Sequence, residues 1–245
     1  MKSLLIIFSL LSFSVLADYT VEGAENVNNN RQIDASDKAK QTLENAATIL
    51  VKKTNKKKKH VWLEPGVISK TVIIEGIPFT INRDQDRKHL IAKLYQKTGR
   101  GIIKPMHPFK PHAVETIGEL EMISYISRLS DKKKDVVVVD ARKPIWLILA
   151  GSLPGSINVP FHTFKKDKNL ARETMEDEFG VIVKSNGQLD FSQAKTLAVY
   201  CNGNWCKMSP ELIWKLLDYG YPAEKIKYYR GGMQAWQLLG LTVVE

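Results

Sequence analysis

The sequence predicts an α/β fold in which a parallel sheet carries helices on both faces, with a small N-terminal accessory region in front of it. Two short, largely apolar runs, Asp135–Asp140 and Lys195–Tyr200, begin at charged residues. Such runs are typical of buried parallel strands. Amphipathic helical patterns lie between and after them. Strands that alternate with helices indicate a parallel sheet with its ligands at the carboxyl ends of the strands.

The first seventeen residues have the pattern of a secretory signal peptide. Lys2 precedes an apolar run over residues 4–16, which is followed by the small residue Ala17. The run is too short to span a bilayer, which takes about 20 residues. We therefore expect residues 1–17 to be removed, the mature chain to begin near Asp18 and the protein to be periplasmic or secreted, not membrane-spanning. An uncleaved N-terminal anchor is the alternative.

Most of the formal net charge of +10 lies before residue 111, and the lysines of residues 51–60 supply a large part of it. We expect residues 18–60 to form a basic linker, disordered over 18–33 and helical over 34–52. Its lysines form either a solvated, self-repelling linker or a tether to an anionic membrane surface, a cell wall or an acidic partner. Because an exported protein has little access to nucleic acid, we expect none to bind.

Residues 61–111 form the predicted accessory region, and they contain no catalytic pattern. Their function stays open, and a protein-partner surface is one interpretation. The expected elements are a strand over 67–74, a turn at Glu75-Gly76, a return strand over 77–81 placed at an edge by Pro78, a helix over 86–98 and an extended connector over 104–111.

Residues 112–245 form the predicted α/β domain. Ser209, Pro210 and Glu211 suit the cap and the first turn of a helix, which Gly220 ends. The other expected elements are a helix over 117–129 and strands over 135–140, 195–200 and 225–229.

Cys201 is the candidate nucleophile, because it directly follows a buried strand and precedes a helix. Glycine and asparagine tolerate positive φ, so we expect the loop to curl with its amides pointing inward. With the helix N-terminus these amides make an anion-binding nest that lowers the pKa of the Cys201 thiol. An unreactive buried cysteine is the alternative. The predicted substrate-binding residues are Asn202, Gly203, Asn204, Trp205, Cys206, Lys207, Met208 and Ser209.

Five sequence fragments, in order, make residues 112–245 resemble a rhodanese-like domain. They are Ile117-Gly-Glu-Leu120, Asp140-Ala-Arg142, Gly151-Ser-Leu-Pro-Gly-Ser-Ile-Asn-Val-Pro160, Cys201 itself, and Tyr229-Arg-Gly-Gly232 followed by Trp236 and Gly240. The resemblance implies sulfur transfer: a sulfur donor leaves its outer sulfur on Cys201 as a persulfide, and a thiol or other thiophilic acceptor removes it. We expect no cofactor and no metal. Asp140 and Arg142 are supporting residues, which orient the loop or form a structural ion pair.

The loop also departs from the family pattern. Seven residues separate Cys201 from Ser209, which is longer than in compact rhodaneses. Related phosphatases close a longer loop with an arginine, whereas this chain offers Cys206 and Lys207. Without a bidentate guanidinium, phosphate monoester chemistry is disfavoured. Two other classes stay open: a non-catalytic rhodanese-fold binding module, and a thiol-redox or soft-metal site that uses Cys201, Cys206 and Met208.

Cys201 and Cys206 are the two cysteines of the chain. A bond between them closes a very small loop and restrains little chain entropy, so we expect such a bond to be chemical in purpose. One hypothesis makes Cys206 a resolving or protective thiol for a Cys201 persulfide. The other points Cys206 into the helix packing, where it never meets Cys201.

Overall fold

The computed structural model describes residues 38, 40–42, 44, 60–99, 101–131 and 134–245. The chain divides into two units, residues 1–58 and 59–245. Within the first unit, residues 38, 40–42 and 44 are helical and belong to the helix expected over 34–52. The expected signal peptide, the expected disorder over 18–33 and the lysines of 52–59 lie outside the described residues. In the described part of the chain, no helix is both long and apolar enough to cross a membrane.

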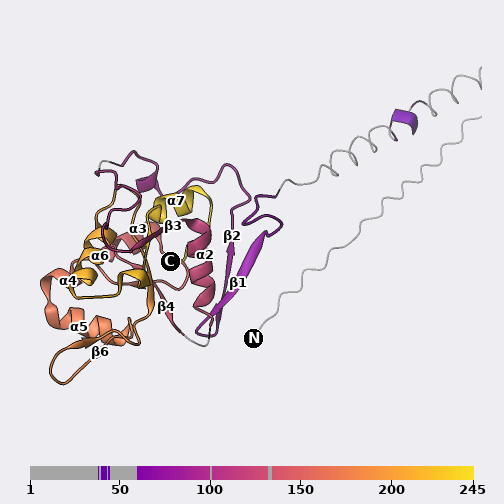
Figure 1. Ribbon diagram of the computed structural model, residues 1–245. Helices are drawn as coiled ribbons and strands as arrows, with labels where there is room; N and C mark the ends of the chain where they lie inside the picture. Colours follow the sequence, from indigo (N-terminus) through magenta and orange to yellow (C-terminus); the bar gives the residue numbers. More distant parts are fainter. Residues whose placement is uncertain (1–37, 39, 43, 45–59, 100, 132–133) are drawn as a thin grey trace, which may run out of the picture. The chain divides into compact units, whose positions relative to one another are not determined.

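The second unit is built on a five-stranded sheet with the order β3-β9-β8-β4-β5, in which all neighbouring strands are parallel (Figure 1). This confirms the predicted fold class and places β8 in the centre of the sheet. The strands are β3 (Glu115–Ile117), β4 (Val136–Asp140), β5 (Ile157–Asn158), β8 (Thr196–Tyr200) and β9 (Ile226–Tyr229).

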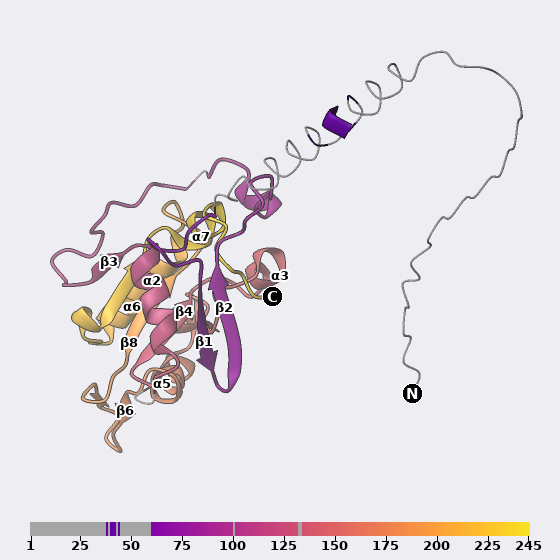
Figure 2. The same ribbon diagram turned by 90° about the vertical axis from the view of Figure 1, so that its right-hand side faces the viewer.

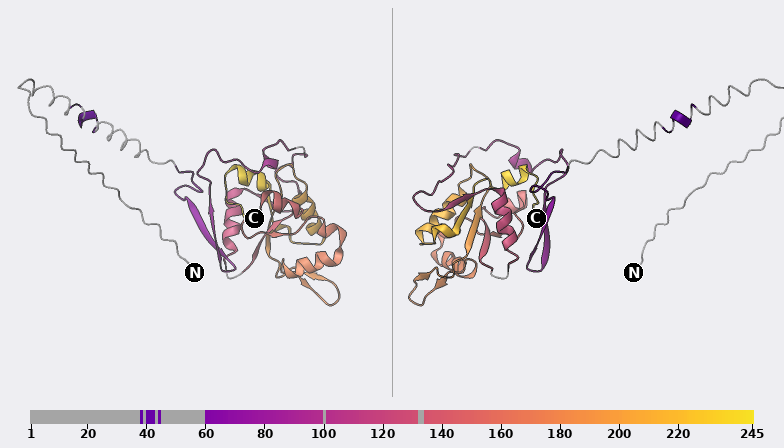
Figure 3. Two further views of the ribbon diagram at one scale, coloured as in Figure 1. Left: turned by 180° about the vertical axis from the view of Figure 1, so that it is seen from behind. Right: turned by 45° about the vertical axis from the view of Figure 1, so that its right-hand side comes forward.

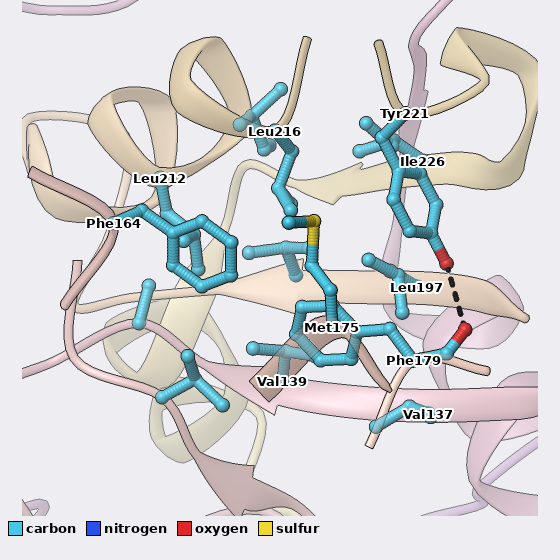
Figure 4. Close-up of a cluster of buried hydrophobic side chains, with 14 of the residues drawn as sticks. Val137, Val139, Phe164, Met175, Phe179, Leu197, Leu212, Leu216, Tyr221 and Ile226 are labelled. Atoms are coloured by element: carbon cyan, nitrogen blue, oxygen red, sulfur yellow. Dashed lines mark hydrogen bonds between the residues drawn. The ribbon is translucent and has the colours of Figure 1, made fainter. Parts of the chain in front are cut away.

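Alternate residues of the central strands face two different hydrophobic clusters, as the period of a strand requires. On β4, Val137 and Val139 lie in one cluster and Val138 in the other. Helices α4, α5 and α6 cover the first face, where Phe164, Met175 and Leu216 pack together (Figure 4). Helices α2 and α7 cover the second. The helices are α2 (Glu119–Arg128), α3 (Ile145–Ala150), α4 (Thr163–Lys166), α5 (Lys168–Asp177), α6 (Met208–Asp218) and α7 (Gly232–Leu238).

A short antiparallel pair, β6 (Ile182–Val183) and β7 (Leu189–Asp190), interrupts the chain between α5 and β8. It lies at the opposite end of the domain from α7 (Figure 3). A 3-10 turn, Ala223–Lys225, leads into β9. The helix predicted over 117–129 is shorter than expected, because residues 115–117 are paired to β9 as strand β3.

The accessory region begins with the predicted hairpin. Strands β1 (Ser69–Ile74) and β2 (Ile77–Asn82) pair antiparallel. They are joined through Glu75 and Gly76, whose φ values are 51° and 81°. Both turn residues are therefore in the left-handed region that tight hairpin turns require.

The helix predicted over 86–98 is wrong, since only Lys93–Tyr95 forms a single 3-10 turn. Aspartate side chains hold the backbone in local turns instead: Asp84 Oδ1 accepts from the Asp86 N–H at 2.7 Å, and Asp86 Oδ1 accepts from the Lys88 N–H at 2.9 Å. Such local hydrogen bonds compete with helix formation.

The hairpin packs beside α2, as Figures 1 and 2 show. Val72 and Ile81 are buried in the same hydrophobic cluster as Met122 and Trp236 of the α/β domain. The Arg83 guanidinium also donates to the Leu239 carbonyl at 2.7 Å. The accessory region therefore shares a core with the domain that follows it, while its use as a partner surface stays a prediction.

Candidate active site

The site lies at the carboxyl end of β8. Cys201 is the first residue after this strand, and residues 201–207, the cysteine loop, lead into α6. Because β4 and β9 run parallel to β8 on either side, the residues that follow all three strands meet at one edge of the sheet. This edge brings Asp140, Arg142 and Gly232 to the loop.

Cys201 is buried, with 1% of its surface exposed. Ser209 Oγ donates to Cys201 Sγ at 3.0 Å, and the Ser209 backbone N–H donates to the same sulfur. The prediction that Ser209 caps α6 is wrong, because the helix begins at Met208 and Lys207 is its N-cap residue. Ser209 thus lies in the first helical turn, where its hydroxyl donates a hydrogen bond to the Cys201 thiol.

Cys206 packs against Cys201, and we call the two residues the thiol pair. The loop turns back at Gly203, whose carbonyl accepts from the Cys206 N–H at 2.9 Å. The Cys201 thiol and the backbone amides of Met208 and Asn202 lie close enough to the Cys206 sulfur to lower its pKa. The hypothesis in which Cys206 never meets Cys201 is therefore wrong. Around the thiol pair lie the side chains of Met208, Trp146, Phe161 and Trp205.

The two thiols hold their protons unequally. The hydrogen bond from Cys201 lowers the pKa of Cys206 to about 7, against the effect of burial and with help from the backbone amides of Met208 and Asn202. Burial raises the pKa of Cys201 well above its ordinary value, and the neighbouring Cys206 raises it further. The predicted lowering of the Cys201 pKa is thus wrong. Amides do point at the sulfurs, but the second thiol takes the negative charge first.

The curl of the loop also differs from the prediction. Among the described residues the positive φ values lie elsewhere, and Asn202, Gly203 and Asn204 have none. Gly203 instead provides space: a Cβ on it would lie 3.2 Å from Trp205 Nε1 and 3.3 Å from Gln234 Oε1. These two atoms are joined by a hydrogen bond of 2.8 Å, so glycine at this position lets Trp205 bind Gln234.

The start of α7 fixes the backbone of the cysteine loop. Gly232 has a φ of 57°, and a Cβ on it would lie 2.7 Å from the Gly203 backbone nitrogen. The Met233 N–H donates to the Cys201 carbonyl and the Gln234 N–H to the Asn202 carbonyl, both at 2.9 Å. The glycine thus allows the two backbones to approach closely enough for these bonds.

Part of the accessory region crosses the loop, and we call this segment, residues 92–104 without residue 100, the strap. Tyr95 is buried, and its hydroxyl donates to Asn202 Oδ1 at 2.6 Å. The Gln234 side-chain amide donates to the Tyr95 carbonyl at 3.2 Å. Asn202 Nδ2 is buried with no hydrogen-bond partner in the described part of the chain. The amide group of Asn202 is therefore held by the strap through its oxygen, and its nitrogen keeps free donor capacity.

Two glycines of the strap lie against Trp205. A Cβ on Gly99 would lie 2.6 Å from Trp205 Cδ1, and one on Gly101 would overlap the Trp205 carbonyl. Beyond them, the Lys104 N–H donates to the Asn204 carbonyl at 2.8 Å. The strap thus contacts the loop at three successive places.

The Arg230 guanidinium fixes the end of the strap, since its Nη2 lies 2.7 Å from the Lys104 carbonyl oxygen. A cavity of about 650 Å³ is lined in part by Asp84, His89 and Ile148 and by none of the loop residues.

Asp140 and Arg142 form a fully buried ion pair. Arg142 Nε lies 2.9 Å from Asp140 Oδ1, and Nη2 lies 2.5 Å from Oδ2. Burial alone would lower the pKa of Arg142, but the hydrogen bonds and charge of Asp140 outweigh it and raise that pKa. Arg142 Nη1 also reaches the Tyr95 hydroxyl at 3.4 Å, and Asp140 Oδ2 accepts from the Tyr200 hydroxyl at 3.0 Å. The Asp140–Arg142 ion pair therefore supports the strap through the Tyr95 hydroxyl.

The loop residues predicted to bind substrate divide into two groups. Asn202, Cys206, Met208 and Ser209 lie at the thiol pair, and Gly203 and Trp205 shape the loop. Asn204 and Lys207 are exposed, and the Lys207 ammonium pairs with the Glu211 carboxylate at 3.3 Å on the surface. Lys207 therefore does not take the place of a phosphatase arginine beside the nucleophile.

Sequence reasoning missed the strap and Gln234. Tyr95 and Asn202 are 107 positions apart, so no local pattern joins them. One signal was available: Gly99 and Gly101 frame a single residue before the domain, and such glycines often mark the close approach of two backbones.

Comparison with known proteins identifies the domain. Residues 123–239 match the family model of the Rhodanese-like domain. The solved structures that match include a rhodanese-related protein from Thermoplasma volcanium, with 25% identity over 53% of this chain and 97% of that one and a TM-score of 0.33. A single-domain sulfurtransferase from Saccharomyces cerevisiae has 15% identity over 54% and 95% of the two chains and a TM-score of 0.36.

A third structure, a protein of unknown function from Rhodopseudomonas palustris described as a possible tyrosine phosphatase, has 19% identity over 60% of this chain and 99% of that one, with a TM-score of 0.36. No curated protein gives a significant match.

Proposed function

Because the chain contains a rhodanese-like domain over residues 123–239, we propose that it is a sulfurtransferase that carries sulfane sulfur as a persulfide on Cys201. The observation that carries the proposal is the position of this cysteine. It follows the central strand of a parallel sheet, where such folds hold their ligands, and its sulfur accepts both a hydroxyl and an amide hydrogen bond from Ser209.

The chemistry begins with a thiolate. The pair releases its first proton easily, and the negative charge is held chiefly at Cys206. When Cys201 attacks, Cys206 takes its proton and thereby acts as the internal base. With thiosulfate as the donor, Cys201 sulfur bonds to the outer sulfur, the S–S bond of thiosulfate breaks and sulfite leaves with the electron pair. A thiophilic acceptor then bonds to the outer sulfur and returns the Cys201 thiolate.

The helix N-terminus supports the negative charge in this cycle. The first amides of α6, at Met208 and Ser209, donate to the two sulfurs. Donors at a helix N-terminus stabilise an anion there, both by hydrogen bonds and through the helix dipole. A persulfide is also an anion, so the same amides can hold it.

Phosphate ester hydrolysis receives no support from the site. The arginines near the loop are already engaged: Arg142 binds Asp140, and Arg230 binds the Lys104 carbonyl. Among the residues that the structure describes, a phosphate would therefore meet two thiols and no free guanidinium to pair with its oxygens.

The test is thiocyanate formation from thiosulfate and cyanide by the full-length protein. We expect wild type to turn over and Cys201→Ser to be inactive, since a hydroxyl cannot form a persulfide yet fills nearly the same space. Circular dichroism should show that the variant keeps its fold. Turnover retained in Cys201→Ser would show that Cys201 is not the nucleophile. A wild-type protein that neither releases sulfite nor gains a sulfur would favour the non-catalytic binding module.

A further inference from the structure

We propose that Cys206 is the resolving nucleophile of the site: it attacks the Cys201 persulfide, releases the outer sulfur as hydrosulfide and leaves a Cys201–Cys206 disulfide. This inference rests on the proposed function, because the persulfide must form first. It adds a second outcome to the cycle, reduction of sulfane sulfur to sulfide at the expense of a dithiol.

Cys206 and Cys201 are already packed together. They lie in one buried cluster, with 4% and 1% of their surfaces exposed, and the neighbouring Cys201 thiol lowers the pKa of Cys206. The turn closed by the Cys206 N–H on the Gly203 carbonyl holds Cys206 back toward Cys201. A nucleophile already in contact with its target gains the large advantage of an intramolecular reaction.

The surroundings of Cys206 also favour its thiolate. The neighbouring Cys201 thiol and the backbone amides of Met208 and Asn202 lower the pKa of Cys206 to about 7, against the effect of burial. Nucleophilic attack on a sulfur–sulfur bond requires that thiolate.

The burial of Cys201 also favours an internal nucleophile. Only 1% of its surface is exposed, and the strap contacts the neighbouring loop residues Asn202 and Trp205. An acceptor in solvent therefore does not reach the Cys201 sulfur without movement of the surrounding chain, whereas Cys206 already lies in the same buried cluster.

The step balances without an external oxidant. The proton that Cys206 took from Cys201 passes to the outer sulfur of the persulfide. The Cys206 thiolate bonds to the inner sulfur, the bond between inner and outer sulfur breaks, and the outer sulfur leaves as hydrosulfide with the electron pair. Sulfane sulfur is reduced and the two cysteines are oxidised. A dithiol reductant then exchanges with the disulfide and restores both thiols, so a dithiol-supplying reaction must accompany this one.

The experiment reacts the reduced full-length protein with one equivalent of thiosulfate in the absence of other thiols. Acid-quenched samples are followed by intact mass spectrometry, and released sulfite and sulfide are measured. Wild type should pass from one added sulfur atom to a mass two hydrogens below the dithiol, with one sulfide released per chain. Cys206→Ser and Cys206→Ala lack the internal base, so they should release sulfite more slowly. Once loaded, they should keep the added sulfur roughly tenfold longer.

The outcomes are separable. If wild type keeps its persulfide as long as the Cys206 variants do, or if those variants release sulfide equally fast, Cys206 does not resolve it. If wild type and both variants release no sulfite, the proposed sulfur transfer fails instead. Delivery of the stored sulfur to cyanide by loaded Cys206→Ser would show that this variant keeps a working persulfide site and that its persulfide persists because the resolving thiol is missing. A loaded variant that cannot deliver its sulfur would show instead that a damaged site preserves the persulfide, and this would overturn the assignment.

Discussion

The reactivity of the thiol pair depends on which of its two sulfurs carries a proton. Because the hydrogen bond from Cys201 lowers the pKa of Cys206 to about 7, a thiolate is present above that pH and is lost below it. We expect the ultraviolet thiolate absorbance of the reduced protein to rise first through a step near pH 7. In Cys206→Ser, the remaining Cys201 should titrate well above an ordinary cysteine, because burial opposes its charge. Identical titrations of wild type and variant would contradict this assignment.

The buried Asp140–Arg142 ion pair gives a second prediction, which concerns stability. Arg142→Met leaves the Asp140 carboxylate fully buried without its cation, which should cost about 3–5 kcal/mol of unfolding free energy in urea denaturation. Arg128→Met is the matched control, because Arg128 pairs with Asp135 at 3.0 Å but both side chains are well exposed. Its loss should stay below about 1 kcal/mol. Equal losses in the two variants would show that burial adds nothing to the Arg142 pair.

Some of these residues could be named from the sequence, and others could not. Cys201, Asp140 and Arg142 lie directly after apolar runs, so their place at the sheet edge follows from the strand pattern. The ionisation of Cys201 could not be predicted, since it depends on which donors reach which sulfur. Tyr95 was beyond local reasoning, because the hydrogen bond that gives it a role joins two regions far apart in sequence.

The strap is the element that connects the accessory region to the site. Tyr95→Phe removes the hydroxyl that donates to Asn202 Oδ1 and leaves that oxygen buried without its partner, an arrangement that costs about 1–3 kcal/mol. The closed strap should lose that stabilisation, and alkylation of the thiol pair by iodoacetamide should become faster by about tenfold or more.

Tyr125→Phe on α2 is the control for this change, because it removes a tyrosine hydroxyl away from the cysteine loop. Its alkylation rate should match that of wild type. The strap would have no gating role if Tyr95→Phe also reacted at the wild-type rate while hydrogen exchange showed unchanged protection of residues 92–99.

Elements with strong local signals were predicted well, and those decided by long-range contacts were not. The strand over Val136–Asp140 follows from its β-branched run, and the hairpin turn follows from Glu75-Gly76. The apolar spacing over residues 86–98 resembles that of a helix. The segment is not helical, because aspartate side chains bind the backbone locally and the Ala92 N–H donates to Gln237 Oε1 at 3.0 Å. Strand β3 was missed because three residues carry too little pattern to identify a strand.

The whole molecule couples its accessory region to its chemistry. The hairpin shares a hydrophobic cluster with α2 and α7, and the strap that follows it contacts the cysteine loop. A mutation in the accessory region can therefore change the reactivity of the thiol pair without touching either sulfur. The sequence divided residues 61–111 from residues 112–245 by composition, but composition says nothing of a shared core.

We also propose that the protein acts outside the cytosol, on the pattern of residues 1–17. An oxidising compartment would favour the disulfide form of the thiol pair and make its activity depend on a dithiol reductant. N-terminal sequencing of the protein recovered from an extracytoplasmic fraction should begin near Asp18. Leu10→Arg is the matched variant: a charge within the apolar run opposes insertion into the membrane, so this chain should keep Met1 and stay inside the cell. Recovery of Met1 from the exported wild-type protein would contradict cleavage, and export of both chains alike would remove the apolar run as its cause.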